Sequence, residues 1–268
     1  IRDSSVTGVQ TCALPISPMA APYRAVFLDV GDTLVHADPS WPAIIARVAA
    51  SGGIDVTPEA LVAAERSIAP EIARRFAAGE RHTSSLPTSE AFWTWVYDGL
   101  LSECGVDAGA RPAIAHECHV AFNDFASWRA FTDTAPLLEA LDLRRAEGLH
   151  VGVLSNWESW LEPLLVHMGI ASHFDALTVS GEVALEKPDA GIFDHALVAA
   201  GLDRSTAHLA VHVGDSWSAD VAGARGVGIA PVWLDRERRG APDRLASTTT
   251  IRTLADLPAL IDAGLVKA

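Results

Sequence analysis

Hydrophobic and polar residues follow a helical period over much of the first half of the chain. From about Pro39 to Phe125, apolar side chains recur three or four positions apart, as expected of amphipathic helices. Capping residues and early acids stand at Thr57-Pro58-Glu59 and Thr88-Ser89-Glu90, where such helices would begin. We therefore predict an all-helical block with helices over Pro42–Ser51, Pro58–Ala78, Ser89–Cys104 and Ala110–Ala126.

The rest of the chain alternates short apolar runs with helical patterns. The runs predict strands at Arg24–Asp29, His150–Ser155, Ala176–Ser180, His208–Val213 and Gly228–Trp233. The helical patterns lie at Leu137–Glu147, Glu158–Met168, Ala190–Ala200, Ala219–Gly226 and Leu254–Ala263. Strands that alternate with helices in this way are typical of a doubly wound parallel sheet. We predict an α/β fold with a Rossmann-like core.

The order of the two patterns predicts the domain organisation. The helical block interrupts the α/β pattern directly after its first strand, and open parallel sheets bind ligands at the carboxyl ends of their strands. We expect residues 19–37 and 131–268 to form the catalytic core, and residues 38–130 to form an inserted all-helical cap domain over that edge. Residues 1–18 show neither period and resemble a translated sequencing adapter, so we interpret them as an artefact or a disordered lead.

Charge and composition narrow the classes of function. The chain carries 20 Lys and Arg against 34 Asp and Glu, a net charge of −14, which disfavours nucleic acids and anionic membranes as partners. No apolar run approaches the roughly 18 residues of a membrane-spanning helix. The 3 Cys form no CxxC pair, which suits a reducing compartment, so we expect a cytoplasmic protein. The sequence does not predict the oligomeric state.

Four short polar segments stand at the carboxyl ends of predicted strands or directly after them. They contain Asp29 with the turn Val30-Gly31-Asp32-Thr33, the pair Ser155-Asn156, Lys187 before Pro188, and Asp215 with Asp220 around a helix start. Each segment taken alone has a plainer explanation as a cap, a turn or a surface residue. Because the carboxyl ends of parallel strands meet at one edge, we expect the four segments to form a single site.

This set of segments resembles the haloacid dehalogenase-like hydrolase superfamily, most closely its branch with a helical cap inserted after the first strand. The resemblance covers essentially Arg24 to Ala263. It implies that Asp29 is the catalytic nucleophile and that Ser155 and Lys187 hold the transferring phosphoryl group. The substrate-binding residues implied by the motifs are Thr33, Ser155, Asn156 and Lys187.

The same resemblance implies a Mg²⁺ site. Its members would be Asp29, the carbonyl group of Gly31, Asp215, and Asp220 as a ligand or a supporting group. Physical reasoning favours the same chemistry, because a phosphomonoester brings about two negative charges to a carboxylate nucleophile. A divalent cation on one side and Lys187 on the other would offset that repulsion.

We therefore expect a Mg²⁺-dependent phosphatase that acts on a small phosphorylated metabolite. Attack by Asp29 on phosphorus would give an aspartyl-phosphate, which water then hydrolyses. Closure of the cap would exclude bulk water and position the substrate.

One position departs from the usual pattern of such phosphatases, whose first motif reads Asp, any residue, Asp, Gly, Thr. Here Gly31 stands two positions after Asp29, where the second Asp would act as general acid and base. Thr33 fixes the register, so Asp32 occupies the usual Gly position, and we favour a turn residue there over a shifted acid/base. Asp32 stays a catalytic candidate, since Asp32, a cap residue or water would then supply the proton. Loss of that group would affect alkyl phosphates most, because their poor leaving groups need a proton.

Three other functions follow from this departure. A weakly active or non-catalytic member of the family would bind a phosphorylated ligand or a protein partner without turnover. A 2-haloacid dehalogenase uses the same nucleophilic Asp but no metal, so the retained Asp215 and Asp220 count against it. Cleavage of phosphonates needs a Schiff-base Lys from the cap, and residues 39–126 contain no Lys.

Overall fold

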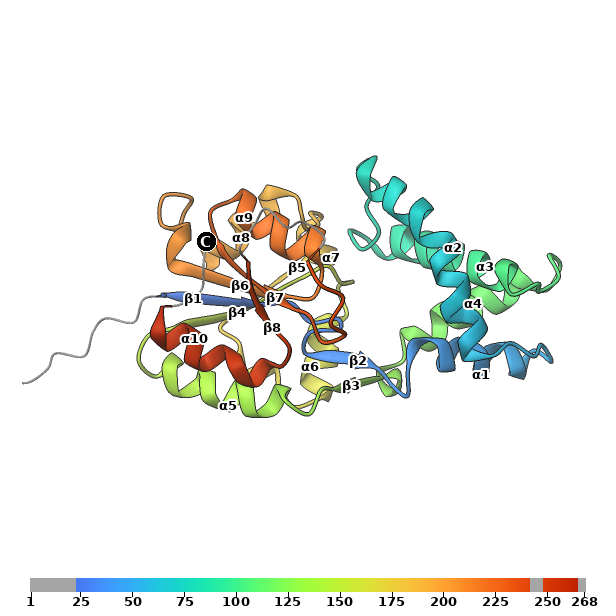
Figure 1. Cartoon of the computed structure of the whole chain (residues 1–268), viewed down its shortest axis with the longest axis horizontal. Coiled ribbons are helices and arrows are strands. Elements are labelled where there is room, and N and C mark those ends of the chain that lie inside the picture. Colours follow the sequence, from blue (N-terminus) through green and yellow to red (C-terminus); the bar gives the residue numbers. More distant parts are fainter. Residues whose placement is uncertain (1–22, 242–247, 265–268) are drawn as a thin grey trace, which may run out of the picture.

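The core of the protein is a parallel sheet, as the alternating pattern predicts. The computed structural model describes residues 23–241 and 248–264, so the predicted lead at residues 1–18 lies outside the described residues. Within those residues the main sheet has 6 strands in the order β5-β4-β1-β6-β7-β8, and all neighbours are parallel (Figure 1). The strands are β1 (Ala25–Leu28), β4 (His150–Ser155), β5 (Ala176–Val179), β6 (Ala210–Gly214), β7 (Ala230–Leu234) and β8 (Thr249–Ile251).

Helices cover both faces of this sheet, because alternate residues of each strand point to opposite sides. In β1, Val26 and Leu28 belong to one apolar core, whereas Ala25 and Phe27 belong to the other. The first face packs against α5 (Thr134–Arg145), α6 (Leu161–His167) and α10 (Leu257–Ala263). The second packs against α8 (Ala190–Ala199) and α9 (Gly223–Gly226), with short α7 (Ser180–Val183) nearby. Figure 1 shows these two layers above and below the sheet. The predicted doubly wound fold is therefore confirmed.

Several local details differ from the sequence expectation. Strand β8 at the sheet edge was not predicted, because its residues, Thr249–Ile251, include only one apolar side chain. The helix expected over Ala219–Gly226 begins earlier, with a π-helical turn at Trp217–Ala222 that continues into α9. The helix expected from Ser89 begins at Leu86, because Ser85 rather than Thr88 caps it. Short 3-10 turns lie at Phe125–Ser127, Ala171–His173, Ala207–Leu209 and Leu254–Asp256.

A separate helical block lies beside the sheet domain, to its right in Figure 1. It consists of α1 (Trp41–Ser51), α2 (Pro58–Ala77), α3 (Leu86–Glu103) and α4 (Arg111–Phe122). The hydroxyl groups of Ser40, Thr57 and Ser85 accept backbone N–H bonds at the starts of α1, α2 and α3. The block has its own apolar core, which includes Leu61 and Leu101. It therefore packs as a unit around a centre distinct from the two cores of the sheet.

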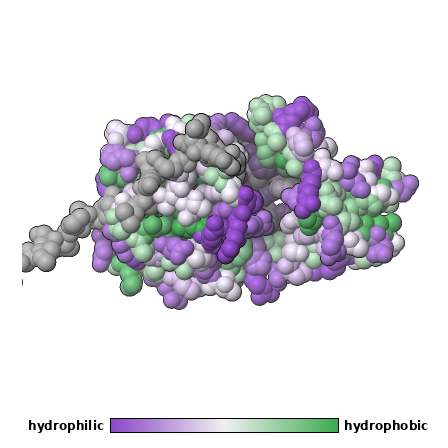
Figure 2. Space-filling view, viewed as in Figure 1, coloured by the Kyte–Doolittle hydropathy of each residue, from purple (hydrophilic) through white to green (hydrophobic). Residues whose placement is uncertain are grey.

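A short antiparallel ribbon joins the two parts. Strand β2 (Val35–Ala37) pairs with β3 (Trp128–Ala130), so the chain enters and leaves the helical block side by side. Neither strand was predicted, and β3 lies inside the range 38–130 expected to be all-helical. Figure 2 shows a furrow between the two parts, with hydrophilic residues gathered on its sheet-domain side. No helix in the described part of the chain is long and apolar enough to cross a membrane.

Candidate active site

Asp29 stands at the carboxyl end of β1, one of the two middle strands of the described sheet. Its backbone N–H donates to the carbonyl group of Val213 at 2.9 Å, which extends the pairing with β6 by one residue. Its carboxylate is buried, and Oδ1 accepts a bond from Oγ of Ser155 at 2.9 Å. Oδ2 lies 3.4 Å from the hydroxyl group of Thr33. The first and second predicted segments therefore meet at this carboxylate.

Lys187 brings the third segment to the same point. Its ammonium group is buried and donates to Oδ1 of Asp29 at 2.8 Å, to the carbonyl oxygen of Leu154 at 2.9 Å and to Oδ1 of Asp220 at 2.6 Å. Its backbone is held by Asn156, whose Oδ1 accepts the Lys187 N–H at 2.7 Å and whose Nδ2 donates to the Lys187 carbonyl at 2.9 Å. Asn156, expected to bind substrate, thus uses its amide group to position Lys187.

The fourth segment completes a cluster of acids. Oxygen atoms of Asp29, Asp215 and Asp220 lie within 4.8 Å of one another. Burial and the nearby charges of Asp29 and Asp220 raise the pKa of Asp215 to about 8. Carboxylate oxygens at this spacing suit a hard divalent cation such as Mg²⁺, whose charge would oppose that rise in pKa. The donor set therefore fits the expected metal.

Lys187, Asp220 and Asp29 are three buried ionisable groups that shift one another's pKa values. Burial lowers the pKa of Lys187, but Asp220 and Asp29 outweigh this effect and raise it above the ordinary value. Burial likewise raises the pKa of Asp220, yet Lys187 and His212 hold it well below its usual range. Burial raises the pKa of Asp29, while Lys187 opposes the change. The Lys187–Asp220 pair is therefore charged, whereas the pKa of Asp29 is shifted upward, in the direction that an additional cation would oppose.

His212 takes part in this network, a role that the sequence did not indicate. It lies on β6, fully buried, and its Nε2 is 2.9 Å from Oδ1 of Asp220. The other Asp220 oxygen accepts the backbone N–H of Ser216 at 2.9 Å. Within the described residues, Nδ1 of His212 has no hydrogen-bond partner. Both carboxylate oxygens of Asp220 are thus engaged, which favours a supporting role for Asp220.

The turn after Asp29 has the backbone that the motif register predicts. Asp32 adopts a positive φ of 53°, the left-handed region that Gly would fill most easily, and its side chain is exposed. A Cβ atom built on Gly31 would lie 3.2 Å from Cζ3 of the buried Trp157. Trp157 packs edge-on against Trp128 and Trp160, with ring centroids 4.6 and 5.3 Å away. An indole ring therefore crowds the space beside Gly31 that an acidic side chain would need.

Arg239 is a further charged residue at this edge that sequence reasoning missed. Its Nη2 lies 3.1 Å from the carbonyl oxygen of Asp215 and 3.4 Å from Oδ2 of the same residue. Its own backbone N–H donates to the buried carboxylate of Asp235 at 2.8 Å. Because the loop after β7 brings it there, only the fold reveals the contact.

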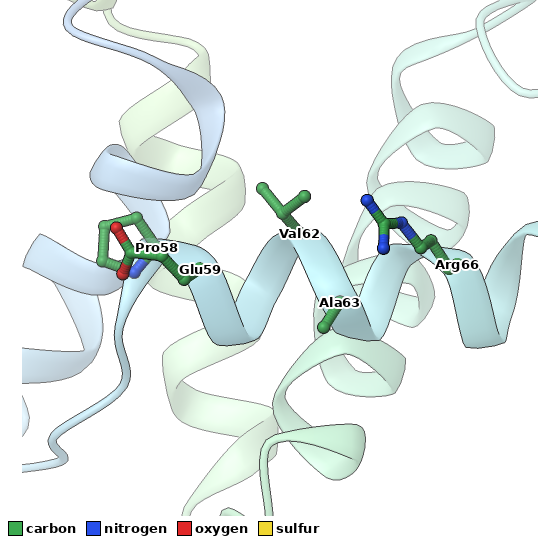
Figure 3. A pocket seen from close by; sticks show the side chains of 5 residues that line it. All are labelled: Pro58, Glu59, Val62, Ala63 and Arg66. Atoms are coloured by element: carbon green, nitrogen blue, oxygen red, sulfur yellow. The ribbon is translucent and has the colours of Figure 1, made fainter.

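A shallow hollow on α2 is separate from this cluster. Pro58, Glu59, Val62, Ala63 and Arg66 line it, and Figure 3 shows their side chains along one stretch of the helix. None of the residues that line it belongs to the four segments. The four predicted segments instead meet at the strand ends, where residues 29, 155, 187, 215 and 220 converge.

The model of the haloacid dehalogenase-like hydrolase family matches residues 23–228. The chain belongs to this family. Haloacid dehalogenase-like hydrolase domain-containing protein 3 of Danio rerio is 29% identical over 228 residues, which cover 82% of this chain and 88% of that protein. Phosphoserine phosphatase of Thermus thermophilus is 36% identical over 160 residues, or 58% of this chain and 62% of that protein.

Among solved structures, the family hydrolase YfnB of Bacillus subtilis, crystallised with bound magnesium, has the same fold. The TM-score is 0.70 at 19% identity, over 90% of this chain and 99% of that one. This protein is therefore a haloacid dehalogenase-like hydrolase with a phosphatase among its relatives.

Proposed function

We propose that this hydrolase is a Mg²⁺-dependent phosphatase of a small phosphorylated metabolite, with Asp29 as its nucleophile. The observation that carries the proposal is the position of the Asp29 carboxylate, which accepts a bond from the Lys187 ammonium group and lies within 4.8 Å of oxygen atoms of Asp215 and Asp220. A buried carboxylate that contacts one cation and belongs to a cation-binding cluster suits attack on an anionic phosphorus centre. The phosphatase relative from Thermus thermophilus supports the same reaction class.

Each side chain of the site has a distinct role in this reaction. One oxygen of Asp29 attacks phosphorus, the bond from phosphorus to the leaving oxygen breaks, and an aspartyl-phosphate forms. Lys187 and Ser155, both hydrogen-bonded to Asp29, are placed to hold the phosphoryl oxygens. Water then attacks the aspartyl-phosphate, which releases inorganic phosphate and restores the carboxylate.

A magnesium ion would be held by Asp29 and Asp215, with the carbonyl group of Gly31 as a third ligand. When bound, Mg²⁺ offsets the negative charge that the substrate adds to the site. Asp220 would support the ion indirectly, because its two oxygens bind Lys187, His212 and the Ser216 amide. The acids are partly or fully buried, so their mutual repulsion is poorly screened without a cation.

The crowding of Gly31 by Trp157 bears on the substrate. A positioned general acid contributes about 10²–10⁴-fold to turnover, and residue 31 supplies none. Substrates whose leaving oxygen departs without a proton, such as aryl and acyl phosphates, therefore suit this site better than alkyl phosphates. The same observation keeps a second candidate open, a family member that binds a phosphorylated ligand with little or no turnover.

The Asp29→Asn variant decides between these two functions. With an aryl phosphate and Mg²⁺, we expect the wild type to turn over and the variant to lose at least about 10³-fold of its rate, because an amide is a poor nucleophile. The exposed Glu182→Gln variant serves as a matched control that should retain the wild-type rate. Equal and trivial rates in wild type and Asp29→Asn would instead support the non-catalytic binder.

A further inference from the structure

A segment of the helical block lies directly on the part of the sheet domain that carries Lys187. This segment, residues 81–85 between α2 and α3, is called the strap below. The hydroxyl group of Thr83 lies 2.6 Å from Oγ of Ser180. The guanidinium group of Arg81 donates to the carbonyl oxygen of Ala184 and lies 3.5 Å from Oδ2 of Asp189. The strap therefore contacts residues of the sheet domain on both sides of Lys187, from Ser180 to Asp189.

Glu186 is the centre of this contact. Its Oε1 accepts the backbone N–H groups of His82, Thr83 and Ser84, at 2.8, 2.6 and 2.9 Å. Nδ1 of His82 lies 3.0 Å from the other oxygen, Oε2. The residue is 7% exposed. Three consecutive amides of the strap thus converge on one carboxylate oxygen of the sheet domain.

Because Glu186 is buried, its carboxylate needs the hydrogen bonds that it receives only when the strap is in place. A buried carboxylate without donors is costly, and amides that lose their acceptor incur a similar penalty. Burial raises the pKa of Glu186, but the contacts with His82 and the strap amides outweigh it and hold the pKa below its ordinary value. The carboxylate is therefore charged, and its charge-assisted bonds favour the state in which the strap is seated.

Lys187, the next residue, does not rely on Glu186 for its own position. Asn156 binds both its backbone N–H and its carbonyl oxygen, and Leu154 and the two acids hold its ammonium group. A change at Glu186 would consequently weaken the seating of the strap while leaving these bonds intact. The effect of Glu186 on the reaction then runs through the helical block.

We propose that Glu186 is a positioning residue that latches the helical block over the phosphate site. This inference rests on the proposed phosphatase function. If the latched state is the one that binds substrate well, a smaller latched population weakens apparent binding by the same factor. Saturating substrate restores the latched state, so the maximal rate is nearly preserved.

Steady-state kinetics with an aryl phosphate and Mg²⁺ test the latch. We expect Glu186→Ala to raise KM about tenfold or more while kcat changes less than about threefold. Glu186→Gln keeps an oxygen acceptor of the same reach, so its KM should lie between those of wild type and Glu186→Ala. It also provides a readout if the alanine variant does not fold. Glu182→Ala, an exposed Glu on the adjacent α7, should match the wild type.

Hydrogen exchange of the amides at residues 82–84 gives a second, substrate-free readout. We expect exchange at least about tenfold faster in Glu186→Ala than in wild type or Glu182→Ala. Unchanged exchange, or faster exchange with unchanged KM, would overturn the latch. A fall in kcat at constant KM would overturn it too, because it would place Glu186 in the chemical step. A wild type without any phosphatase activity would refute the proposed function, whereas the exchange comparison needs no substrate.

Discussion

Charged pairs are buried in the strand-end site but exposed on helix α2 of the helical block. In the site, the Lys187 side chain is 2% exposed and lies between the carboxylates of Asp29 and Asp220. On α2 of the block, Arg74 pairs with Glu71, but the two side chains are 69% and 42% exposed. Buried pairs depend on each partner, whereas exposed pairs are screened by water. We therefore expect substitutions of charged residues to have larger effects at the strand-end site than on the exposed face of α2.

The largest effect that this comparison predicts is that of Lys187→Met. The substitution leaves Asp29 and Asp220 buried without their cation, which should cost about 3–5 kcal/mol of unfolding free energy. Loss of the ammonium group beside the phosphoryl site should also lower turnover by about 10²–10³-fold or more. Denaturant unfolding and aryl phosphate kinetics measure the two effects.

Arg74→Met is the matched control on the block. It removes a cation from an exposed pair, so neither stability nor turnover should change measurably. If both substitutions had equally small effects, the contrast between the two regions would be wrong. A stable but inactive Lys187→Met protein would limit the role of Lys187 to catalysis.

A second prediction concerns the pH dependence of stability, which tests whether the acid cluster is a cation site. The pKa of Asp215 is raised to about 8, so the metal-free folded protein retains a proton that the unfolded chain releases near pH 3.8. This contribution to stability is fully present below the unfolded pKa and is lost as pH rises through about 8. The fall is at most about 1.4 kcal/mol per pH unit.

Thermal unfolding without metal should therefore show that the stability of the wild type declines between pH 5 and 8, a window set by the pKa of about 8. The stability of Asp215→Asn should decline less over the same range. Mg²⁺ should stabilise the wild type more at pH 8 than at pH 6, because the ion replaces the proton. Glu182→Gln should follow the wild type. A flat wild-type profile, or equal stabilisation of Asp215→Asn by Mg²⁺, would contradict the assignment.

Much of the site could be predicted from the sequence, because the signals are local. Asp29 and Ser155 each come at the end of an apolar run that forms a buried strand. Parallel pairing of β1 with β4 and β6 then places these ends at one edge. Lys187 was similarly marked by the Pro that follows it. The existence of the cluster thus follows from strand prediction and topology together.

What the sequence could not predict depends on contacts between distant segments. Glu186 was visible only as the residue before Lys187, and its partners are backbone amides, which every residue has. The bond from His212 to Asp220 depends on how the turn after β6 folds back. The indole ring of Trp157 lies against Gly31 because two strand-end loops meet. Such contacts carry no sequence pattern, since only the completed fold brings their members together.

The smallest predicted effect is at Asp32. Its interpretation as a turn residue and its interpretation as an acid/base catalyst predict opposite results for the same substitutions. Asp32 has a φ of 53°, and its N–H donates to the carbonyl oxygen of Val35 at 2.8 Å, so the backbone explains the residue without any proton transfer. Asn and Gly both tolerate that backbone, and we expect Asp32→Asn and Asp32→Gly to keep aryl phosphate turnover within about threefold. Asp32→Ala should lose about 1 kcal/mol of stability through strain alone. A fall of about 10²-fold or more in Asp32→Asn, with stability unchanged, would instead make Asp32 the proton-transfer group that Gly31 lacks.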